Sequence, residues 1–316
     1  MAGSEDHTGE DAMGRITTRK KVVHITAATD DAEGVVVRRL DTLAVEEPLE
    51  IRVSGAPLTV TMRTPGHDVE LAAGFLVSEG VIRHHDQFAS AIHCGGPGTG
   101  GSAAAPGAYA LGASAADGGN TYNVLDVALA PGTPLPDPSR ARHSYTTSAC
   151  GVCGAASIEQ VATTSAFDVS ADPLEVDAAT LADLPDMLRS RQEVFEKTGG
   201  LHAAGLYDAA TGELLVVRED VGRHNAVDKV VGWAVLNGRL PLTGTVLQVS
   251  GRASFELVQK AVMAGIPMLS AVSAPSSLAV EMAESTGLTL VGFVRGASMN
   301  VYSRPERVRE AVPAAV

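Results

Sequence analysis

The feature that most constrains the fold is the alternation of strand-like and helix-like segments in the C-terminal half. Short apolar runs at 244–251 and 267–274 alternate with amphipathic stretches at 253–266 and 277–288. This alternation is typical of βαβ units, in which parallel strands share one sheet and helices cover its faces. We therefore expect an α/β domain with a parallel or mixed sheet over residues 146–310.

The other elements of this half are predicted from capping and turn signals. Asp177 is a candidate N-cap for a helix over 178–197, which the pair Gly199-Gly200 would end. Residues 201–220 hold two apolar runs around an Ala-Thr-Gly turn, which predicts a β-hairpin. Two further elements are expected, a helix over 225–238 and a strand over 289–296.

The N-terminal half is rich in strand-forming residues separated by Gly, Asp and Pro. We expect a β-rich domain over 18–145, built mostly as an antiparallel meander. Within it, 67–82 carries the i, i+3, i+4, i+7 apolar stripe of a helix. Residues 1–17 are polar and acidic, and 95–120 contain little besides Gly, Ala, Ser and Pro, so we expect a disordered tail and a flexible insertion. The expected strands cover 21–30, 33–55, 57–64 and 121–130.

Composition excludes several classes of protein. The chain has 24 Lys and Arg against 37 Asp and Glu, a net charge of −13, which argues against a nucleic-acid-binding protein. No apolar stretch is long enough for a transmembrane helix, and the N-terminus lacks the apolar core of a signal peptide. Three cysteines do not make a disulfide framework. We expect a cytoplasmic protein with reduced thiols and no membrane partner.

The most informative motif is Cys150-Gly-Val-Cys153, flanked by small residues. One interpretation is half of a zinc site. Structural zinc needs four ligands and a second cysteine pair is missing, so the site would need Cys94, which follows His93, together with a His. A second is dithiol redox chemistry of the thioredoxin kind, although the usual Trp-Cys-Gly-Pro-Cys context is absent. A third is a sulfur-carrying thiol that holds a persulfide, which needs an accessible thiolate with little bulk around it. Two buried structural cysteines are the plain alternative.

A second cluster lies between a predicted strand and a predicted helix, at 217–229. His224 can act there as an acid, a base or a proton relay, beside Asp220 and Arg223. The structural alternative is helix capping by Asn225 and surface ion pairs. We expect that alternative to hold for Asp228 and Lys229.

Two small polar turns follow successive strands, where backbone N–H groups can hold an anion. The first contains Ser250, Gly251 and Arg252, and the second contains Ser276. Because both turns follow parallel strands, we expect them side by side at one sheet edge, where together they make a better phosphate site than either alone. Each alone is weak, because Ser often caps a helix.

A further segment combines an aromatic side chain, a cation and a glycine. In this segment a Phe and an Arg could stack on and clamp a purine nucleotide, while the plain alternative is a β-hairpin turn. The residues are Phe293, Val294, Arg295, Gly296, Ala297 and Ser298.

Taken together, these segments resemble the FdhD family of sulfur carriers needed for formate dehydrogenase activity. The matching stretches include RTPGHDVELAAGFLVSEGVI, TTSACGVCG, TGGLHAAGL, REDVGRHNAVDKVVG and SGRASFELVQKA, followed by AVSAPSSLAVEMAESTGLTLVGFVRG. They run in order over most of residues 50–305. The insertion at 95–120 and the acidic tail carry no part of the match.

The resemblance implies a function. The family takes persulfide sulfur from a cysteine desulfurase and passes it to the molybdenum bis(molybdopterin guanine dinucleotide) cofactor of formate dehydrogenase. The first family cysteine, which carries the persulfide, matches Cys150, and the assisting one matches Cys153. The family's guanine-nucleotide site matches Phe293–Ser298. The resemblance also implies a cytidine-deaminase-like fold and a homodimer.

The implied fold invites a check against deaminase chemistry. Zinc deaminases use His-x-Glu followed by Pro-Cys-x-x-Cys, and this chain has no His-x-Glu and no Pro before its cysteine pair. We therefore expect no resident metal and no permanent cofactor, with the molybdenum cofactor as bound substrate. A cofactor-binding chaperone without enzymatic activity and a zinc-binding module are the alternative functions.

Overall fold

The computed structural model describes residues 16–29, 31–94, 122–136 and 165–310. The predicted flexible insertion, the Cys150–Cys153 motif and the predicted boundary at residue 146 all lie outside these ranges. So does the predicted tail, except for its last two residues. Thr17 already belongs to the first strand.

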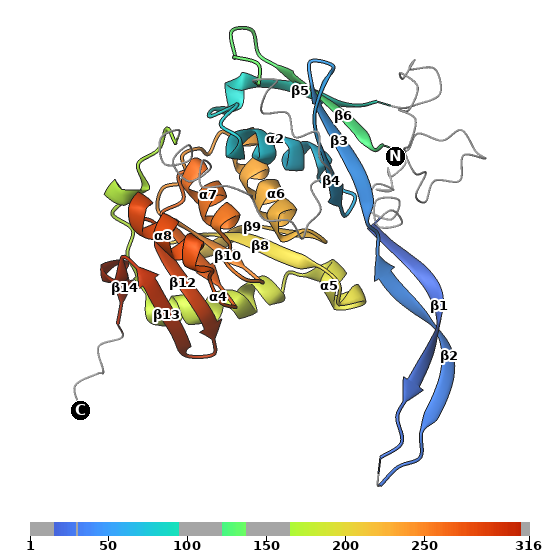
Figure 1. The fold of residues 1–316 in the computed structure, drawn as a ribbon. Coiled ribbons are helices and arrows are strands. Elements are labelled where there is room, and N and C mark those ends of the chain that lie inside the picture. The colour runs from blue at the N-terminus through green and yellow to red at the C-terminus, as the bar shows by residue number, and fades with distance from the viewer. Residues whose placement is uncertain (1–15, 30, 95–121, 137–164, 311–316) are drawn as a thin grey trace, which may run out of the picture.

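A six-stranded mixed sheet forms the centre of the molecule (Figure 1). Strands β10, β11 and β12 run parallel, while β8, β9 and β13 are antiparallel to their neighbours. The mixed sheet is therefore confirmed. In spatial order the strands are β13 (Ser298–Ser303), β12 (Thr289–Arg295), β11 (Met268–Ala271), β10 (Thr245–Val249), β8 (His202–Asp208) and β9 (Glu213–Asp220).

Helices cover both faces of this sheet, as the alternating sequence predicts. Successive strand residues enter opposite cores: Leu247 and Leu269 belong to the larger one, and Val246 and Met268 to the smaller one. The smaller core lies under α4 (Ala178–Arg189). The larger core lies under α6 (Arg223–Leu236), α7 (Phe255–Met263) and α8 (Ser277–Thr286).

A second sheet of four strands lies beyond the helices of the larger core (Figure 1). Its pairings are antiparallel except for the parallel pair β3–β6. Helix α2 (Asp68–Ser78) follows β4 and confirms the helix predicted from the apolar stripe. In spatial order the strands are β4 (Ala56–Arg63), β3 (Glu47–Val53), β6 (Val124–Leu129) and β5 (Phe88–Cys94).

Helices α2 and α6 join the two halves of the chain through a very close crossing. A Cβ atom on Gly74 would lie 1.8 Å from the carbonyl oxygen of Asp228, and one on Gly232 would lie 1.7 Å from that of Glu70. Only glycine allows this approach. A single core cluster consequently contains residues from both halves, such as Leu49 and Leu247.

Strands β1 (Thr17–Thr26) and β2 (Val35–Ala44) form a two-stranded antiparallel ribbon that projects from the body of the protein (Figure 1). The sequence predicts strands here, but as part of a continuous run over 33–55. The structure instead divides this run into β2 and β3, which belong to different sheets. Glu46, between the strands, is exposed.

The helix predicted over 178–197 is wrong in its C-terminal part. Helix α4 ends at Arg189, and α5 (Glu193–Thr198) is a separate short helix. The carboxylate of Glu219 accepts hydrogen bonds from the backbone N–H groups of Val194 and Phe195, at 2.9 and 2.7 Å. This distant side chain satisfies the free donors of a new helix start, which no local signal reveals.

The ends of these helices agree only partly with the capping predictions. Gly199 ends α5 in the left-handed conformation. Asp177 stands at the N-cap of α4 but makes no capping bond there, because its carboxylate pairs with Arg309. The sequence does not predict strand β5, since FASAIHC lacks a clear alternation. The minor elements are β7 (Val176–Asp177), β14 (Val308–Arg309) and the short 3-10 helices His85–Gln87, Val169–Ala171 and Pro305–Arg307.

Candidate functional site

The two polar turns predicted to share a sheet edge lie side by side. The backbone N–H of Ser273 donates to the carbonyl of Gly251 at 3.3 Å, and that of Ser276 donates to the carbonyl of Ala253 at 3.0 Å. Ala253 and Pro275 form an isolated parallel bridge between the same turns. The turns after β10 and β11 therefore form one continuous rim at the carboxyl end of the parallel strands.

The hairpin between β12 and β13 extends this rim. The backbone N–H of Phe293 donates to the carbonyl of Ser273 at 3.2 Å, and Nε of Arg295 donates to the carbonyl of Val272 at 3.2 Å. The segment Phe293–Ser298 therefore forms a β-hairpin turn, which was the structural alternative to a nucleotide clamp. Gly296 has a positive φ of 52° at this turn. The hairpin nevertheless stands beside the candidate phosphate turns.

Phe293 is the most unusual residue of the rim. Its φ is 53°, in the left-handed region that a bulky side chain rarely adopts, and its ring is 40% exposed. Strained backbone of this kind concentrates at binding sites. Val294 is buried in the smaller core, whereas Arg295, Gly296, Ala297 and Ser298 are exposed.

His224 lies at the opposite end of the rim, in the first turn of α6. Its Nε2 is 2.6 Å from Oε2 of Glu256 and 3.3 Å from Oγ of Ser254. These contacts attach α6 to the turn that holds Arg252, which is exposed. Among the described residues, Nε of Arg223 is buried without a hydrogen-bond partner.

His202 completes the cluster of basic groups. A Cβ on Gly251 would lie 3.4 Å from Nδ1 of His202, so this ring stands directly beside the first polar turn. Burial lowers the pKa of His202, and the nearby Arg223 and His224 lower it further against the opposing effect of Asp220. His202 is therefore held in its neutral form.

The serines of the rim partly serve the fold. Oγ of Ser250 accepts the N–H of Ala203 at 2.9 Å, and Oγ of Ser276 accepts the N–H of Ala279 at 3.2 Å. Ser276 is thus the helix cap of α8, which is its ordinary structural role. The exposed cations and the backbone of the turns remain as the groups that can hold an anion.

A hollow of about 570 Å³ opens beside the rim, between the sheet edge and helices α4 and α5. Ser250, Val272 and His202 line its sheet side. Across it, the Arg189 guanidinium lies 4.4 Å from the centre of the Phe195 ring. The hollow is large enough for a drug-sized ligand.

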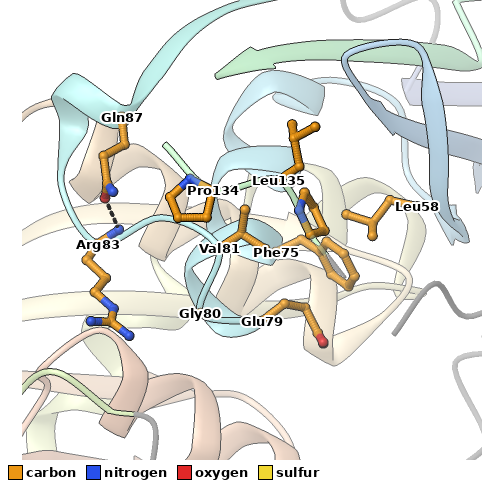
Figure 2. A pocket seen from close by; sticks show the side chains of 10 residues that line it. Leu58, Phe75, Glu79, Gly80, Val81, Arg83, Gln87, Pro134 and Leu135 are labelled. Atoms are coloured by element: carbon orange, nitrogen blue, oxygen red, sulfur yellow. Dashed lines mark hydrogen bonds between the residues drawn. The ribbon is translucent and has the colours of Figure 1, made fainter. Parts of the chain in front are cut away.

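A second hollow of about 290 Å³ lies at the end of α2 (Figure 2). Figure 2 shows Phe75, Leu58 and Leu135 around it, and Gln87 accepting the backbone N–H of Arg83 at 2.6 Å. The lining is mainly apolar, so it lacks the cluster of cations that distinguishes the rim.

A buried polar network holds the start of α6. Nζ of Lys229 lies 2.7 Å from Oδ2 of Asp220 and donates to the carbonyl of Thr64 at 2.9 Å. Asn225 donates to the same Asp220 carboxylate at 3.0 Å and to the carbonyl of Met62 at 2.7 Å. The network fixes the helix that carries His224.

One structural alternative and one prediction for this region are wrong. Asn225 is not the cap of α6, because Gly222 occupies that position. Asp228 and Lys229 do not form surface pairs: both are buried, and Asp228 pairs with Lys260 at 2.8 Å. Both charges find partners in the other half of the chain: Lys229 donates to the carbonyl of Thr64, before α2, and the hydroxyl of Ser78, the last residue of α2, donates to Asp228.

Cys94 is half-buried at the end of β5, where its Sγ lies 3.7 Å from the carbonyl of Ile92. Within the described ranges, no group of three or more His, Cys, Asp or Glu side chains is arranged to hold a metal. Cys150 and Cys153 fall outside those ranges, so the zinc interpretation and the sulfur interpretation both stay predictions. No helix of the described ranges is long and apolar enough to span a membrane.

The sequence did not single out His202 or Glu256. Glu256 follows the polar turn after β10, and its pairing with His224 depends on how α6 and α7 meet. His202 reaches the turn because β8 pairs with β10 in an antiparallel register that sets Ala204 opposite Val249. Neither strand pairing nor helix packing of this kind has a local signal, so the sequence alone indicates neither residue.

A mixed sheet whose parallel strands end in a rim of polar turns and exposed arginines has the architecture at which α/β proteins commonly bind ligands. Comparison with known proteins makes the assignment specific: the model of the FdhD/NarQ family matches residues 44–309. The chain belongs to this family.

Curated relatives agree with the family assignment. The chain is 55% identical over 297 residues to a protein of Streptomyces avermitilis named sulfur carrier protein FdhD, covering 94% of this chain and 97% of the relative. A Mycobacterium tuberculosis protein of the same name is 54% identical over 296 residues, covering 94% of this chain and 100% of the relative. These alignments span nearly the full length of both partners.

A solved structure supports the fold. The crystal structure of a putative formate dehydrogenase accessory protein from Desulfotalea psychrophila matches with a TM-score of 0.66. The alignment covers 93% of this chain and 100% of that chain at 22% identity. At this identity the likeness bears on the fold alone.

Proposed function

We propose that this protein carries sulfur from a cysteine desulfurase to the molybdenum bis(molybdopterin guanine dinucleotide) cofactor of formate dehydrogenase. The observation that carries the proposal is the rim formed by three adjoining turns at the ends of β10, β11 and β12. It combines exposed Arg252 and Arg295 with the strained, exposed ring of Phe293. Relatives over 50% identical bear the name sulfur carrier protein.

The chemistry of the rim suits a guanine dinucleotide. Its phosphates are anionic, and guanidinium groups and backbone N–H groups at strand-to-helix turns are strong phosphate donors. An exposed aromatic ring offers a face on which a base can stack. In a chain of net charge −13, such a ligand is attracted only where cations gather locally.

The sulfur enters through Cys150. Its thiolate attacks the terminal sulfur of the desulfurase persulfide, forming a new S–S bond, while the old S–S bond breaks and the desulfurase cysteine leaves as a thiolate. The oxidation states balance, because one sulfane sulfur is exchanged between two thiols. Gly151 and Gly154 leave little steric bulk near the attacking atom.

The sulfur leaves with help from Cys153. Its thiolate attacks Sγ of Cys150, which forms a disulfide between the two cysteines and expels the terminal sulfur as hydrosulfide. The two electrons that turn sulfane sulfur into sulfide come from the two thiols. The hydrosulfide would then replace an oxygen ligand of the molybdenum in the substrate cofactor, and that oxygen would leave as water by taking the hydrosulfide proton and one proton from solvent. An external dithiol restores the reduced pair.

Several further expectations belong to this proposal. The partners are a cysteine desulfurase and formate dehydrogenase, the protein acts in the cytoplasm as a homodimer, and the mixed-sheet domain is cytidine-deaminase-like. A cofactor-binding chaperone without sulfur chemistry is the second candidate, favoured by the well-formed rim itself. It predicts that the cysteines resist alkylation in the native protein.

Intact mass spectrometry tests the sulfur step. After incubation with a desulfurase and cysteine, the wild-type protein should gain the mass of one sulfur atom, which a reductant removes. Cys150→Ala should gain none, whereas the matched control Cys94→Ala should load like the wild type. Cys153→Ala should load but fail to release hydrosulfide. Loading of Cys150→Ala to the wild-type level contradicts the proposal, and stoichiometric zinc in the purified protein favours a zinc-binding module.

A further inference from the structure

His224 is held by a carboxylate through one ring nitrogen, while its other ring nitrogen is open. Nε2 lies 2.6 Å from Oε2 of Glu256 and 3.3 Å from Oγ of Ser254. Within the described ranges Nδ1 has no hydrogen-bond partner, yet it is not shut off from solvent. A carboxylate that fixes an imidazole through one nitrogen leaves the other nitrogen oriented for proton transfer, as in catalytic triads.

A second observation at this place points to a ligand. Nε of Arg223 is buried without an acceptor among the described residues, although buried donors normally have one. Burial, followed by the charges of Arg223 and His224, lowers the pKa of His202, so the three side chains lie close together. The starts of α6 and α7 meet here as well, because His224 contacts Ser254, the N-cap of α7. The charged and titratable groups of this cluster are Glu256 of α7, Arg223 and His224 of α6, His202 of β8 and Asp220 of β9.

The cluster lies at the end of the rim away from Phe293. Phe293 belongs to β12 and His202 to β8, three strands further along the sheet. At about 4.8 Å per strand the separation is roughly 14 Å. In the proposed substrate, a ribose, two phosphates and a pterin separate the guanine base from the metal. A base on Phe293 therefore leaves the reacting end of the substrate further along the rim, towards His224.

We propose that His224 delivers the proton that is needed when sulfur replaces the oxygen ligand of the substrate. Glu256 is the positioning residue that holds the imidazole for this step. The inference rests on the proposed function and adds to it a proton donor on this chain.

The proton balance defines the step. Hydrosulfide forms a bond to the molybdenum of the substrate, and the bond between the molybdenum and the leaving oxygen breaks. The hydrosulfide proton and the Nδ1 proton of the His224 imidazolium convert that oxygen into water. No electrons are exchanged, and the neutral His224 then takes up a proton from solvent. The imidazole thus relays the solvent proton to the leaving oxygen.

Single-turnover transfer separates proton delivery from sulfur loading. Protein loaded with labelled sulfur is mixed with formate dehydrogenase whose cofactor lacks its sulfur ligand, and the rate of label transfer is measured from mildly acidic to alkaline pH. By intact mass, His224→Gln should load like the wild type, but it should transfer sulfur at least about 100-fold more slowly. It should also lose the fall in rate with rising pH that a protonated imidazole imposes on the wild type.

A matched control replaces a histidine at the opposite end of α6. His85 is exposed, and its Nδ1 would lie 3.6 Å from a Cβ on Gly238, which follows the end of that helix. His85→Gln should therefore keep both the transfer rate and the pH profile of the wild type.

Two further variants distinguish proton delivery from a structural role of the ring. His224→Ala should transfer slowly and recover when imidazole is added, because the free acid replaces the missing one. Glu256→Gln keeps a hydrogen-bonding group without the charge, so the fall in its rate should move to lower pH, since a carboxylate favours the protonated ring. Glu281→Gln, on the exposed side of α8, is its control and should match the wild type.

The outcomes separate this inference from the proposed function. A wild-type rate and pH profile in His224→Gln would overturn the inference. So would a slow His224→Ala that imidazole does not restore, or loss of sulfur loading in both His224 variants. A wild type that takes up no sulfur, or never passes it on, would contradict the proposed function itself and this inference with it.

Discussion

At the scale of single residues, Phe293 carries the strongest sign of a binding role. An aromatic residue with positive φ and an exposed ring gains nothing for folding from that conformation. The hydrogen bonds of its N–H to Ser273 and of Arg295 to Val272 hold it there. The rim therefore holds the exposed Phe293 in a fixed conformation at the same sheet edge as the exposed Arg252 and Arg295.

Replacing Phe293 with Ala should weaken binding of guanosine diphosphate, used as a probe for the dinucleotide ends. Loss of one base–aromatic stack costs about 1–3 kcal/mol, which predicts a dissociation constant raised roughly 5- to 150-fold. Isothermal titration calorimetry measures it. The control Leu135→Ala removes an exposed apolar side chain from the second hollow and should bind like the wild type. Equal affinities of all three proteins would show that Phe293 does not contribute to nucleotide binding.

His202 should make stability depend on pH. Its folded-state pKa is lowered from the usual value of 6.5, chiefly by burial, so the unfolded state binds the proton more readily. Stability is then complete above the unfolded pKa and falls as the pH decreases through it towards the lower folded value. Urea unfolding of wild type and His202→Gln between neutral and mildly acidic pH should show a shallower loss in the variant. An equal slope would show that His202 titrates normally.

Glu70 should make the stability of the protein depend on pH in a more acidic range than His202 does. Burial raises the pKa of this carboxyl, but hydrogen bonds from Arg218 and His67 outweigh burial and lower the pKa to about 2. Its stabilisation is present above the unfolded pKa and is lost as the pH falls from about 4.5 towards 2. The Glu70→Gln protein should therefore be less stable than the wild type at neutral pH, and the difference should shrink in acid. A difference independent of pH would contradict this assignment.

At the scale of elements, the strands and helices of the C-terminal half can be predicted from the sequence, while the contacts between elements distant in the chain cannot. Alternating apolar runs located β10, β11 and β12 with their helices, because each element buries one periodic face. The break between α4 and α5 depends on Glu219, which reaches the helix start from another strand. Likewise, the two polar turns can be predicted to lie side by side because they follow parallel strands. The position of His202 beside the first turn cannot, because it depends on the register in which β8 pairs with β10.

The crossing of α2 and α6 gives a sharp prediction. Gly232→Ala places a methyl group against the carbonyl of Glu70 and must push the helices apart, which costs about 1–3 kcal/mol or more for overpacking of this kind. Chemical denaturation measures the loss. Gly200→Ala is the control, since its Cβ would meet only one atom at 3.9 Å. If both variants keep wild-type stability, the two helices do not meet as described.

At the scale of the whole molecule, buried charges connect the two halves of the chain. The carboxylate of Asp220 accepts a hydrogen bond from the N–H of Thr64. Nζ of Lys229 contacts both residues, because it pairs with the Asp220 carboxylate and donates to the carbonyl of Thr64. The charges of Asp228 and Lys229 predict surface positions, because a sequence does not show that a buried lysine will find partners from a distant loop. The rim is thus positioned by a network that spans both halves.

Removing one member of this network should be costly. Lys229→Met leaves the Asp220 carboxylate buried without its cation, and breaking a buried pair in this way costs about 3–5 kcal/mol. Lys197→Met changes an exposed lysine and should stay within about 0.5 kcal/mol of the wild type. Thermal and urea unfolding compare the two. A small loss for Lys229→Met would mean that the pair contributes little to joining the halves.

The most direct test of sulfur delivery follows a labelled atom. Protein loaded with isotopically labelled sulfur is mixed with formate dehydrogenase whose cofactor lacks its sulfur ligand, and the label on the isolated cofactor is measured. The wild type should pass label to the cofactor and activate the enzyme, whereas Cys150→Ala should do neither. Activation by Cys150→Ala equal to that by the wild type, or label that never leaves the loaded protein, would contradict a carrier role for this thiol.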